Sequence, residues 1–386
     1  MAPSRSKVTL VSEHRYSLEG GQLHDSEDHR NQIRRYTAAS NDVLLVSRTG
    51  RPRSPHDVAV DLSGHLSHVP LPQWSHYSIL AKWPEIWLTL RRSTTGRDVS
   101  IIRVPSAVAL IACIPRTILS DRLAVEVVGD PGSVMTSGIL PRWVARCASR
   151  PFQSLMGRLV RRSVAVSHVG PTPFSSTYLP VNPDAVFFAS NVEIPAELFA
   201  RRRVRASARR LVAVGTMEVP YKGFHHLISA VSLVVSQGYD LEVSIVGDGR
   251  LRAPLQEMAA QLGLGERVHF TGLLSKSEVL DQLKMADAFV LSSTTEGLPR
   301  AMIEAMALGL PVIATSVGAV PELINPEWLV QPADPEGLAH SIIRLASVPV
   351  EKRQSLSEQM VDRATPYAKE RLDRVRADFL KAAIAL

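Results

Sequence analysis

The second half of the chain alternates between short apolar runs and stretches of helical periodicity, and this alternation restricts the possible folds more than any other feature. The apolar runs lie at 211–215, 241–247, 267–270, 288–291 and 311–315. Stretches with helical spacing lie at 224–237, 251–262, 276–285, 300–308 and 336–346. Near-continuous apolar strands between helices indicate a parallel sheet covered on both faces. A doubly wound α/β domain is therefore predicted here.

The first half shows the same alternation less clearly. Strands are expected at 7–12, 42–47, 99–102 and 125–128, and a helix is expected at 143–162. Tryptophan, proline and histidine gather between residues 70 and 87, where the pattern assigns no element. A second α/β domain is the prediction for this half.

Length supports two domains, because 386 residues exceed what one ordinary core contains. We expect domains at 1–200 and 201–365, with the boundary in a basic, alanine-rich segment. Residues 366–386 have helical spacing and are expected to form either a surface helix or a helix that crosses back to the first domain.

Composition excludes several classes of protein. The hydrophobic fraction is 45%, and the longest apolar run, 107–114, is far shorter than the roughly 20 residues of a membrane-spanning helix. The first residues lack the pattern of a secretory signal, so a cytoplasmic location is expected. Two cysteines cannot form a disulfide framework or a cysteine zinc cluster. The arginines at 201–205 lack interleaved aromatic residues, which favours a solvated linker over a nucleic-acid site.

Two carboxylates flank a predicted loop-to-helix junction. Glu296 follows a run of serines and threonines, and Glu304 lies within the mostly apolar helix that follows. Each alone could be a surface charge or a residue that complements the helix dipole. Together they suit a ligand with hydroxyls and phosphates, because carboxylates accept hydrogen bonds from hydroxyls and helix-start amides attract phosphate. The segment predicts a nucleotide-sugar site.

Two further loops follow predicted strands, where ligands bind in open α/β sheets. Lys222 stands at a predicted helix start, a position that suits a diphosphate but also occurs by chance. Gly247 and Gly249 allow a close backbone approach, although the pair could equally be a simple turn.

In chain order, these segments resemble the nucleotide-sugar-binding domain of the retaining glycosyltransferases with a two-glutamate motif, the glycosyl transferases group 1. The resemblance covers about a third of the chain, from residue 211 to about 345. It rests on Gly215 with Lys222 and Gly223, 246–249, 268–272, 286–287, 292–293, the two glutamates, 309–315, Gly318 and 321–322. It implies the GT-B architecture, in which two Rossmann-like doubly wound domains face each other across a cleft, with acceptor binding in 1–200 and donor binding in 201–365.

The resemblance also implies roles for individual residues. Glu296 would hold hydroxyls of the donor sugar, Glu304 the ribose, and Lys222 the diphosphate. Pro299 has no amide hydrogen, so the backbone amides of Leu298, Arg300 and Ala301 are expected to donate hydrogen bonds to the phosphates. The full set of expected donor-site residues is Gly20, Gly21, Gly215, Thr216, Lys222, Gly247, Gly249, Leu274, Glu296, Gly297, Leu298, Arg300, Ala301 and Glu304.

Two positions leave alternatives open. Thr216 stands where many members of the family have arginine, so leaving-group stabilisation would depend more heavily on Lys222. Because of this difference, the alternative is that the protein is a non-catalytic or pseudo-sugar-coupling member of the same fold. Asp130 is a candidate catalytic residue with Glu296 and Lys222, or else part of an ordinary Asp-Pro-Gly turn.

The resemblance implies a metal-independent hexosyl or N-acetylhexosaminyl transferase that retains anomeric configuration and needs no cofactor beyond its co-substrate. The expected donor is a UDP- or GDP-linked sugar. The expected acceptor is a hydroxyl of a small molecule, as in bacterial antibiotic biosynthesis. A lipid-linked acceptor at a membrane surface, in synthesis of an envelope glycan, is the alternative. No nucleic-acid partner is expected.

Overall fold

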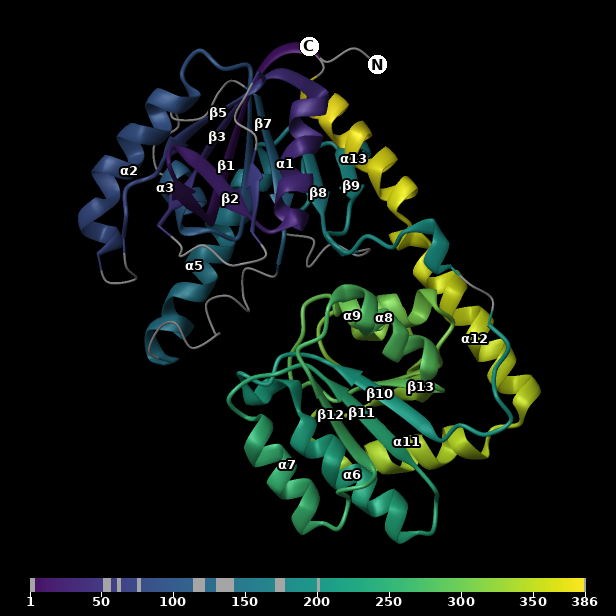
Figure 1. The fold of residues 1–386 in the computed structure, drawn as a ribbon. Coiled ribbons are helices and arrows are strands. Elements are labelled where there is room, and N and C mark those ends of the chain that lie inside the picture. Colours follow the sequence, from purple (N-terminus) through teal and green to yellow (C-terminus); the bar gives the residue numbers. More distant parts are fainter. Residues whose placement is uncertain are drawn as a thin grey trace. The chain divides into compact units, whose positions relative to one another are not determined.

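The computed structural model describes residues 4–50, 57–60, 64–74, 78–113, 122–129, 142–170, 178–199 and 202–384 (Figure 1). The chain divides into two compact units. Unit 1 comprises Met1–Asn191 and Asp373–Leu386, and unit 2 comprises Val192–Leu372. The sequence places the domain boundary after residue 200, whereas the structure divides the chain after Asn191 and returns it to unit 1 at Asp373.

Unit 2 contains a six-stranded, fully parallel sheet. Its strands are β10 (Arg210–Val214), β11 (Glu242–Val246), β12 (Val268–Gly272), β13 (Ala288–Leu291), β14 (Val312–Thr315) and β15 (Leu329–Val330). Their spatial order is β12-β11-β10-β13-β14-β15, so the direction of chain progression reverses between β10 and β13. The doubly wound sheet predicted for this half is confirmed.

Helices cover both faces of this sheet (Figure 1). They are α6 (Phe224–Ser236), α7 (Arg252–Gln261), α8 (Lys276–Met285), α9 (Arg300–Ala307), α10 (Val320–Leu323), α11 (Pro335–Ser347) and α12 (Val350–Ala364). Helix α8 begins with a capping box: the Ser275 amide donates to Glu278 at 2.7 Å, and the Ser275 hydroxyl accepts from the Glu278 amide at 3.4 Å. Buried aliphatic residues of the strands pack against these helices, with Phe289 fully buried.

Unit 1 contains a nine-stranded sheet. Seven strands run parallel in the order β5-β3-β1-β6-β7-β8-β9, which again reverses beside the first strand. They are β1 (Ser4–Glu19), β3 (Ser40–Thr49), β5 (Leu66–Pro70), β6 (Val99–Val104), β7 (Arg122–Val127), β8 (Ala165–His168) and β9 (Val186–Phe188). Strand β2 (Gln22–Asp25) pairs antiparallel with the end of β1, and β4 (Val58–Val60) pairs antiparallel with β2.

The helices of unit 1 include one from the C-terminal end of the chain. They are α1 (Glu27–Ala39), α2 (Ile79–Thr94), α3 (Ala107–Cys113), α5 (Arg142–Arg161) and, from Asp373 onward, α13 (Lys369–Ile384). Phe379, Leu380 and Ala383 of α13 join the core cluster that contains Leu10 and Val99. The C-terminal helix is therefore part of the core of unit 1. In the described part of the chain, no helix has both the length and the apolar character needed to cross a bilayer.

Candidate functional site

The reversal point of the sheet in unit 2 brings two loops together. Strands β10 and β13 are hydrogen-bonded neighbours, although β11 and β12 lie between them in the sequence. The loop after β10 runs through 215–223, and the loop after β13 runs through 292–299. In open α/β sheets, ligands bind outside the carboxyl ends of the strands at such a reversal point.

Glycines allow the backbones of neighbouring loops to touch. A Cβ atom at Gly223, where φ is +67°, would overlap the carbonyl oxygen of Ser292. Gly318, after β14, would likewise overlap the carbonyl oxygen of Glu296. The amide of Ala319 completes this contact by donating to the Gly297 carbonyl at 3.0 Å. The loop at 292–299, here called the glutamate loop, is therefore held between the loop after β10 and the loop after β14.

An ion pair joins the two loops across the reversal point. Lys222 Nζ lies 2.7 Å from Glu296 Oε1, and the two side chains are only 18% and 9% exposed. Ser293 Oγ donates to the same carboxylate oxygen at 2.7 Å. The structure thus brings together two residues that sequence reasoning selected for different roles. Sequence reasoning missed Ser293 as their partner, although a serine three residues before Glu296 is a visible signal.

Helix α9 carries the second glutamate of the motif. Pro299 occupies the N-cap position, and the helix begins at Arg300. Glu304 is 9% exposed and lies in a run of buried residues that extends from Met302 to Ala307. An α-helix leaves its first amides without acceptors inside the helix, so the α9 start adds amide donors beside Glu296.

The remaining expected donor-site residues of unit 2 lie in adjacent loops. Gly247 packs on the Gly215 carbonyl, and its amide donates to Gly272 at 3.1 Å. Gly249, at φ +149°, packs against the backbone of Met217 and Glu218, whose loop contains Gly215 and Thr216. Thr216 is exposed, and its hydroxyl accepts from the Glu218 amide at 3.2 Å. Leu274, half-buried after β12, packs against the core.

Two histidines that sequence reasoning missed follow Lys222 at the start of α6. The His225 and His226 ring centroids lie 3.9 Å apart. Burial lowers the pKa of both imidazoles, and the neighbouring His225 lowers the pKa of His226 further. Both rings are therefore largely neutral at pH 7, and Lys222 supplies the positive charge in this turn.

The expected site residues of unit 1 have different outcomes. Gly20 and Gly21, both with positive φ, form the tip of the β1–β2 hairpin, where Glu19 pairs with Gln22. Strand β1, expected to end at residue 12, continues into this hairpin, so the two glycines directly follow the strand. Their contact with donor phosphates stays a prediction. Asp130 lies outside the described residues.

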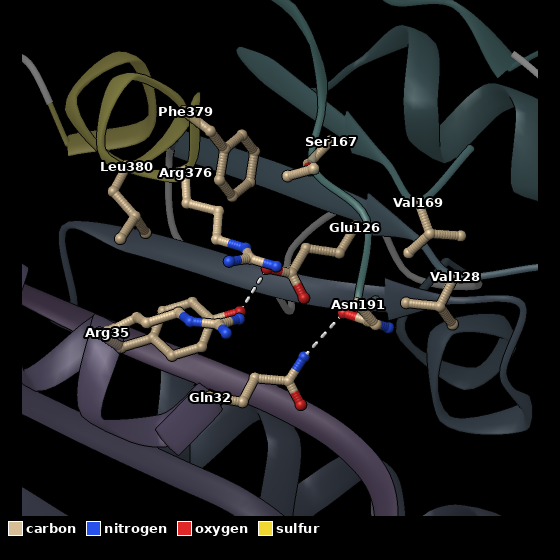
Figure 2. Close-up of a pocket in the computed structure, with 12 residues that line it drawn as sticks. Gln32, Arg35, Glu126, Val128, Ser167, Val169, Asn191, Arg376, Phe379 and Leu380 are labelled. Carbon is tan, nitrogen blue, oxygen red and sulfur yellow. Dashed lines mark hydrogen bonds between the residues drawn. The ribbon is translucent and has the colours of Figure 1, made fainter. Parts of the chain in front are cut away.

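Beside the carboxyl ends of β7, β8 and β9, unit 1 contains a cavity of about 30 Å³ (Figure 2). The Glu126 carboxylate lines it, accepting from the Tyr36 hydroxyl and from Arg103 Nε at 2.8 Å. Arg35 and Arg376 also point toward the cavity (Figure 2). Burial, with the charge of Arg376, lowers the pKa of the Arg35 guanidinium to about 10. The network connects the sheet to α1 and α13.

A family model described as glycosyl transferases group 1 matches residues 208–347. The chain is 28% identical to Protein CapJ of Staphylococcus aureus over 67% of this chain and 65% of that protein. It is 32% identical to 2-deoxystreptamine glucosyltransferase of Streptomyces kanamyceticus over 33% of this chain and 34% of that protein. The chain thus spans less than two thirds of each relative.

The fold resembles that of solved glycosyltransferases. The structure of HepE from Anabaena in complex with UDP and glucose aligns with a TM-score of 0.64 and covers 99% of this chain and 100% of that chain. Sequence identity is 16%, so this likeness establishes the GT-B class of fold alone. It confirms the fold class predicted from the sequence.

Proposed function

We propose, on the premise that residues 208–347 belong to the glycosyl transferases group 1 family, that this protein is a glycosyltransferase using a UDP- or GDP-linked sugar as donor. The observation that carries the proposal is the Lys222–Glu296 ion pair at the reversal point of the sheet. It places a cation and a carboxylate side by side, and α9 adds amides next to them. A nucleoside diphosphate sugar presents the complementary groups, namely phosphate oxygens and hydroxyls.

Lys222 takes the charge of the departing diphosphate. Its ammonium group is held in place before the ligand binds, so little reorganisation is required when negative charge develops. Ser293 orients the Glu296 carboxylate, which accepts hydrogen bonds from hydroxyls of the donor sugar. The amides of Leu298, Arg300 and Ala301 meet phosphate oxygens, and Glu304 binds the ribose.

We further propose that transfer retains the anomeric configuration and requires no metal at the donor. The acceptor hydroxyl attacks from the face that the diphosphate leaves, and its proton passes to the departing phosphate. Lysine and helix amides supply the electrostatic stabilisation that a metal ion gives in other sites. The anomeric configuration of the product, measured by the proton coupling constant in NMR, tests retention; an inverted product contradicts it.

The acceptor is proposed to be a small molecule with free hydroxyls. The similarity to 2-deoxystreptamine glucosyltransferase supports this class, and a cytoplasmic bacterial enzyme of antibiotic biosynthesis fits it. A lipid-linked acceptor is the second candidate, because α5 contains five arginines and no acidic residue. Anionic vesicles would bind such a helix in a salt-sensitive manner. Salt-sensitive cosedimentation with these vesicles favours the lipid-linked acceptor, and its absence favours the small molecule.

The test of the donor site uses the variants Lys222→Ala and Glu296→Ala. We expect UDP or GDP to raise the melting temperature of the unmodified protein, because a ligand that binds only the folded state stabilises it. With the matching sugar nucleotide, Lys222→Ala should lower kcat by about 10²–10³-fold, the usual cost of one charge-stabilising donor. Glu296→Ala should also lower product formation.

The control is Lys276→Ala, which removes an exposed lysine from α8 and should leave turnover unchanged. Unchanged turnover in both site variants would contradict the transferase assignment to this site. Nucleotide binding without any product would instead support a non-catalytic or pseudo-sugar-coupling member, the alternative that Thr216 leaves open.

A further inference from the structure

Among the described residues, one group of histidine and carboxylate side chains in unit 1 has the composition of a metal site. His14 of β1, Asp25 at the end of β2 and His29 in the first turn of α1 each offer one ligand atom. These atoms all lie within 4.8 Å of one another. The group belongs to unit 1, whereas the donor-binding residues Lys222 and Glu296 belong to unit 2.

Local structure brings the three residues together. The register of β1 against β3 shifts between Val11 and Arg15, and His14 lies within this irregularity. The β1–β2 hairpin then returns the chain, so that Asp25 lies beside His14. Ser26 caps α1 by accepting from the His29 amide at 3.4 Å, which places His29 one turn beyond Asp25.

The carboxylate of the group is ready to act as a ligand. The Asp25 side chain is 3% exposed, its Oδ1 accepts from the Ser26 amide at 2.7 Å, and its Oδ2 contacts His14 Nε2. One carboxylate oxygen is thus already oriented by the Ser26 amide, and the other faces both imidazoles.

The spacing fits a metal ion after small movements. His29 Nδ1 lies 3.6 Å from Asp25 Oδ2, and the two imidazole rings stack with centroids 3.9 Å apart. A tetrahedral ion with bonds of about 2.0–2.1 Å separates its ligand atoms by about 3.4 Å. The Ser26 hydroxyl, now 3.0 Å from His29 Nδ1, has to turn away. The Ser26 amide can stay on Asp25 Oδ1 and orient the carboxylate, as outer-shell partners of metal ligands do.

We propose that His14, Asp25 and His29 bind one divalent transition-metal ion of the Zn²⁺ type. Two imidazole nitrogens and one carboxylate oxygen suit Zn²⁺ and Co²⁺, whereas Mg²⁺ and Ca²⁺ prefer all-oxygen ligands. Water completes a fourth position. The ion cross-links the β1–β2 hairpin to α1.

Co²⁺ titration of the full chain tests the site, because tetrahedral Co²⁺ absorbs visible light. We expect one Co²⁺ per chain, with displacement by Zn²⁺ and no competition from millimolar Mg²⁺. His29→Ala and Asp25→Asn should each weaken Co²⁺ binding by more than about 100-fold, beyond the usual cost of losing an outer-shell partner. The His29 side chain is 36% exposed, so its truncation is compatible with folding.

Two controls separate this site from other effects. His340→Ala removes an exposed histidine of unit 2 and should leave Co²⁺ binding unchanged. Lys222→Ala should lower kcat by about 10²–10³-fold but leave Co²⁺ binding intact, so failure of the donor site and failure of the metal site give different results. Absence of stoichiometric binding, or equal Co²⁺ affinity in folded His29→Ala, overturns the proposal.

Discussion

Unit 2 connects the loops at the carboxyl ends of its strands by direct backbone contact as well as by the Lys222–Glu296 ion pair, whereas unit 1 connects its strands and helices through buried charged side chains. Gly223 and Gly318 lie against carbonyl oxygens of the glutamate loop. In unit 1, the Glu126 carboxylate instead joins Arg103 of β6 to Tyr36 of α1. Both sheets nevertheless reverse beside their first strand.

The difference shows that the same sheet topology can be stabilised by backbone contacts at glycine or by buried charged side chains, and that these are sensitive to different substitutions. Backbone contact requires glycine and is sensitive to added volume. A buried charge network is sensitive to the loss of either partner and to pH. Substitutions that act on one mechanism should therefore affect one unit and spare the other.

The largest effect is expected from Glu126→Ala in unit 1. Arg103 and Glu126 are only 14% and 17% exposed, so truncating the carboxylate leaves a largely buried guanidinium without its partner. The free energy of unfolding should fall by about 3–5 kcal/mol. Four of the five tryptophans belong to unit 1, so urea unfolding followed by tryptophan fluorescence measures it.

The matched control is Glu242→Ala in β11 of unit 2. Its carboxylate lies 3.5 Å from His269 Nε2, and both side chains are about half exposed, so the loss of this contact should cost less than about 0.5 kcal/mol. Equal losses in the two variants would show that unit 1 does not depend on its buried charges.

Acid should destabilise unit 1 through His168. This side chain is fully buried, and burial lowers the pKa of its imidazole to about 4. Because the pKa is lower in the folded state than the unfolded value of about 6.5, its contribution is complete above pH 6.5 and is lost as the pH falls toward 4. Roughly 3 kcal/mol should disappear over this window.

Urea unfolding at a series of pH values, with His168→Phe beside the unmodified protein, measures this loss. The substitution removes the titrating group and should flatten the dependence between pH 6.5 and pH 4. An unchanged slope would mean that other groups control the acid sensitivity.

Replacing glycine by alanine should distinguish a glycine that is required for close backbone contact from one that is required only for its positive φ. Gly223→Ala in unit 2 places a Cβ on the Ser292 carbonyl at positive φ and should cost about 2–4 kcal/mol. Gly21→Ala in unit 1 also has positive φ, but its Cβ meets no atom of the described chain within 4 Å, so it should cost about 1 kcal/mol. Thermal unfolding of both variants tests this difference. Equal decreases in melting temperature would mean that backbone strain alone, and not the added volume, causes the loss of stability.

A small effect is expected from Ser275→Ala. It removes the hydroxyl that accepts from the Glu278 amide at the start of α8. Loss of this cap should reduce the free energy of unfolding by about 1 kcal/mol without changing nucleotide binding. Urea unfolding and nucleotide titration together check it, and weakened nucleotide binding would show that α8 contributes to the site.

The contrast between the units also explains how far the sequence could predict the fold. In unit 2, strands β10 to β14 are nearly continuous apolar runs, so the expected ranges lie within about two residues of the observed ends. Strand β15 has only two residues and is defined by its pairing with β14. The local sequence pattern carries no information about this pairing, so it does not predict the strand. The helix at 350–364 was also not predicted.

Unit 1 was harder to predict because its elements depend on distant partners. Strand β1 was expected at 7–12 but extends over 4–19, because its polar second half pairs with β2 in a hairpin. Helix α2 contains Pro84 and two tryptophans, and its residues stayed unassigned. In the candidate site, Lys222 and Glu296 were both selected, yet their ion pair joins residues 74 positions apart, which a single sequence does not show.

The return of α13 to unit 1 has a consequence for synthesis on the ribosome. Val192–Leu372 forms unit 2 without any other segment, so all of its core residues are synthesised before most of α13. The core of unit 1 also contains residues from the range 8–165, but it lacks Phe379, Leu380 and Ala383 until α13 has been translated. The half of the protein that is made first therefore completes its fold last.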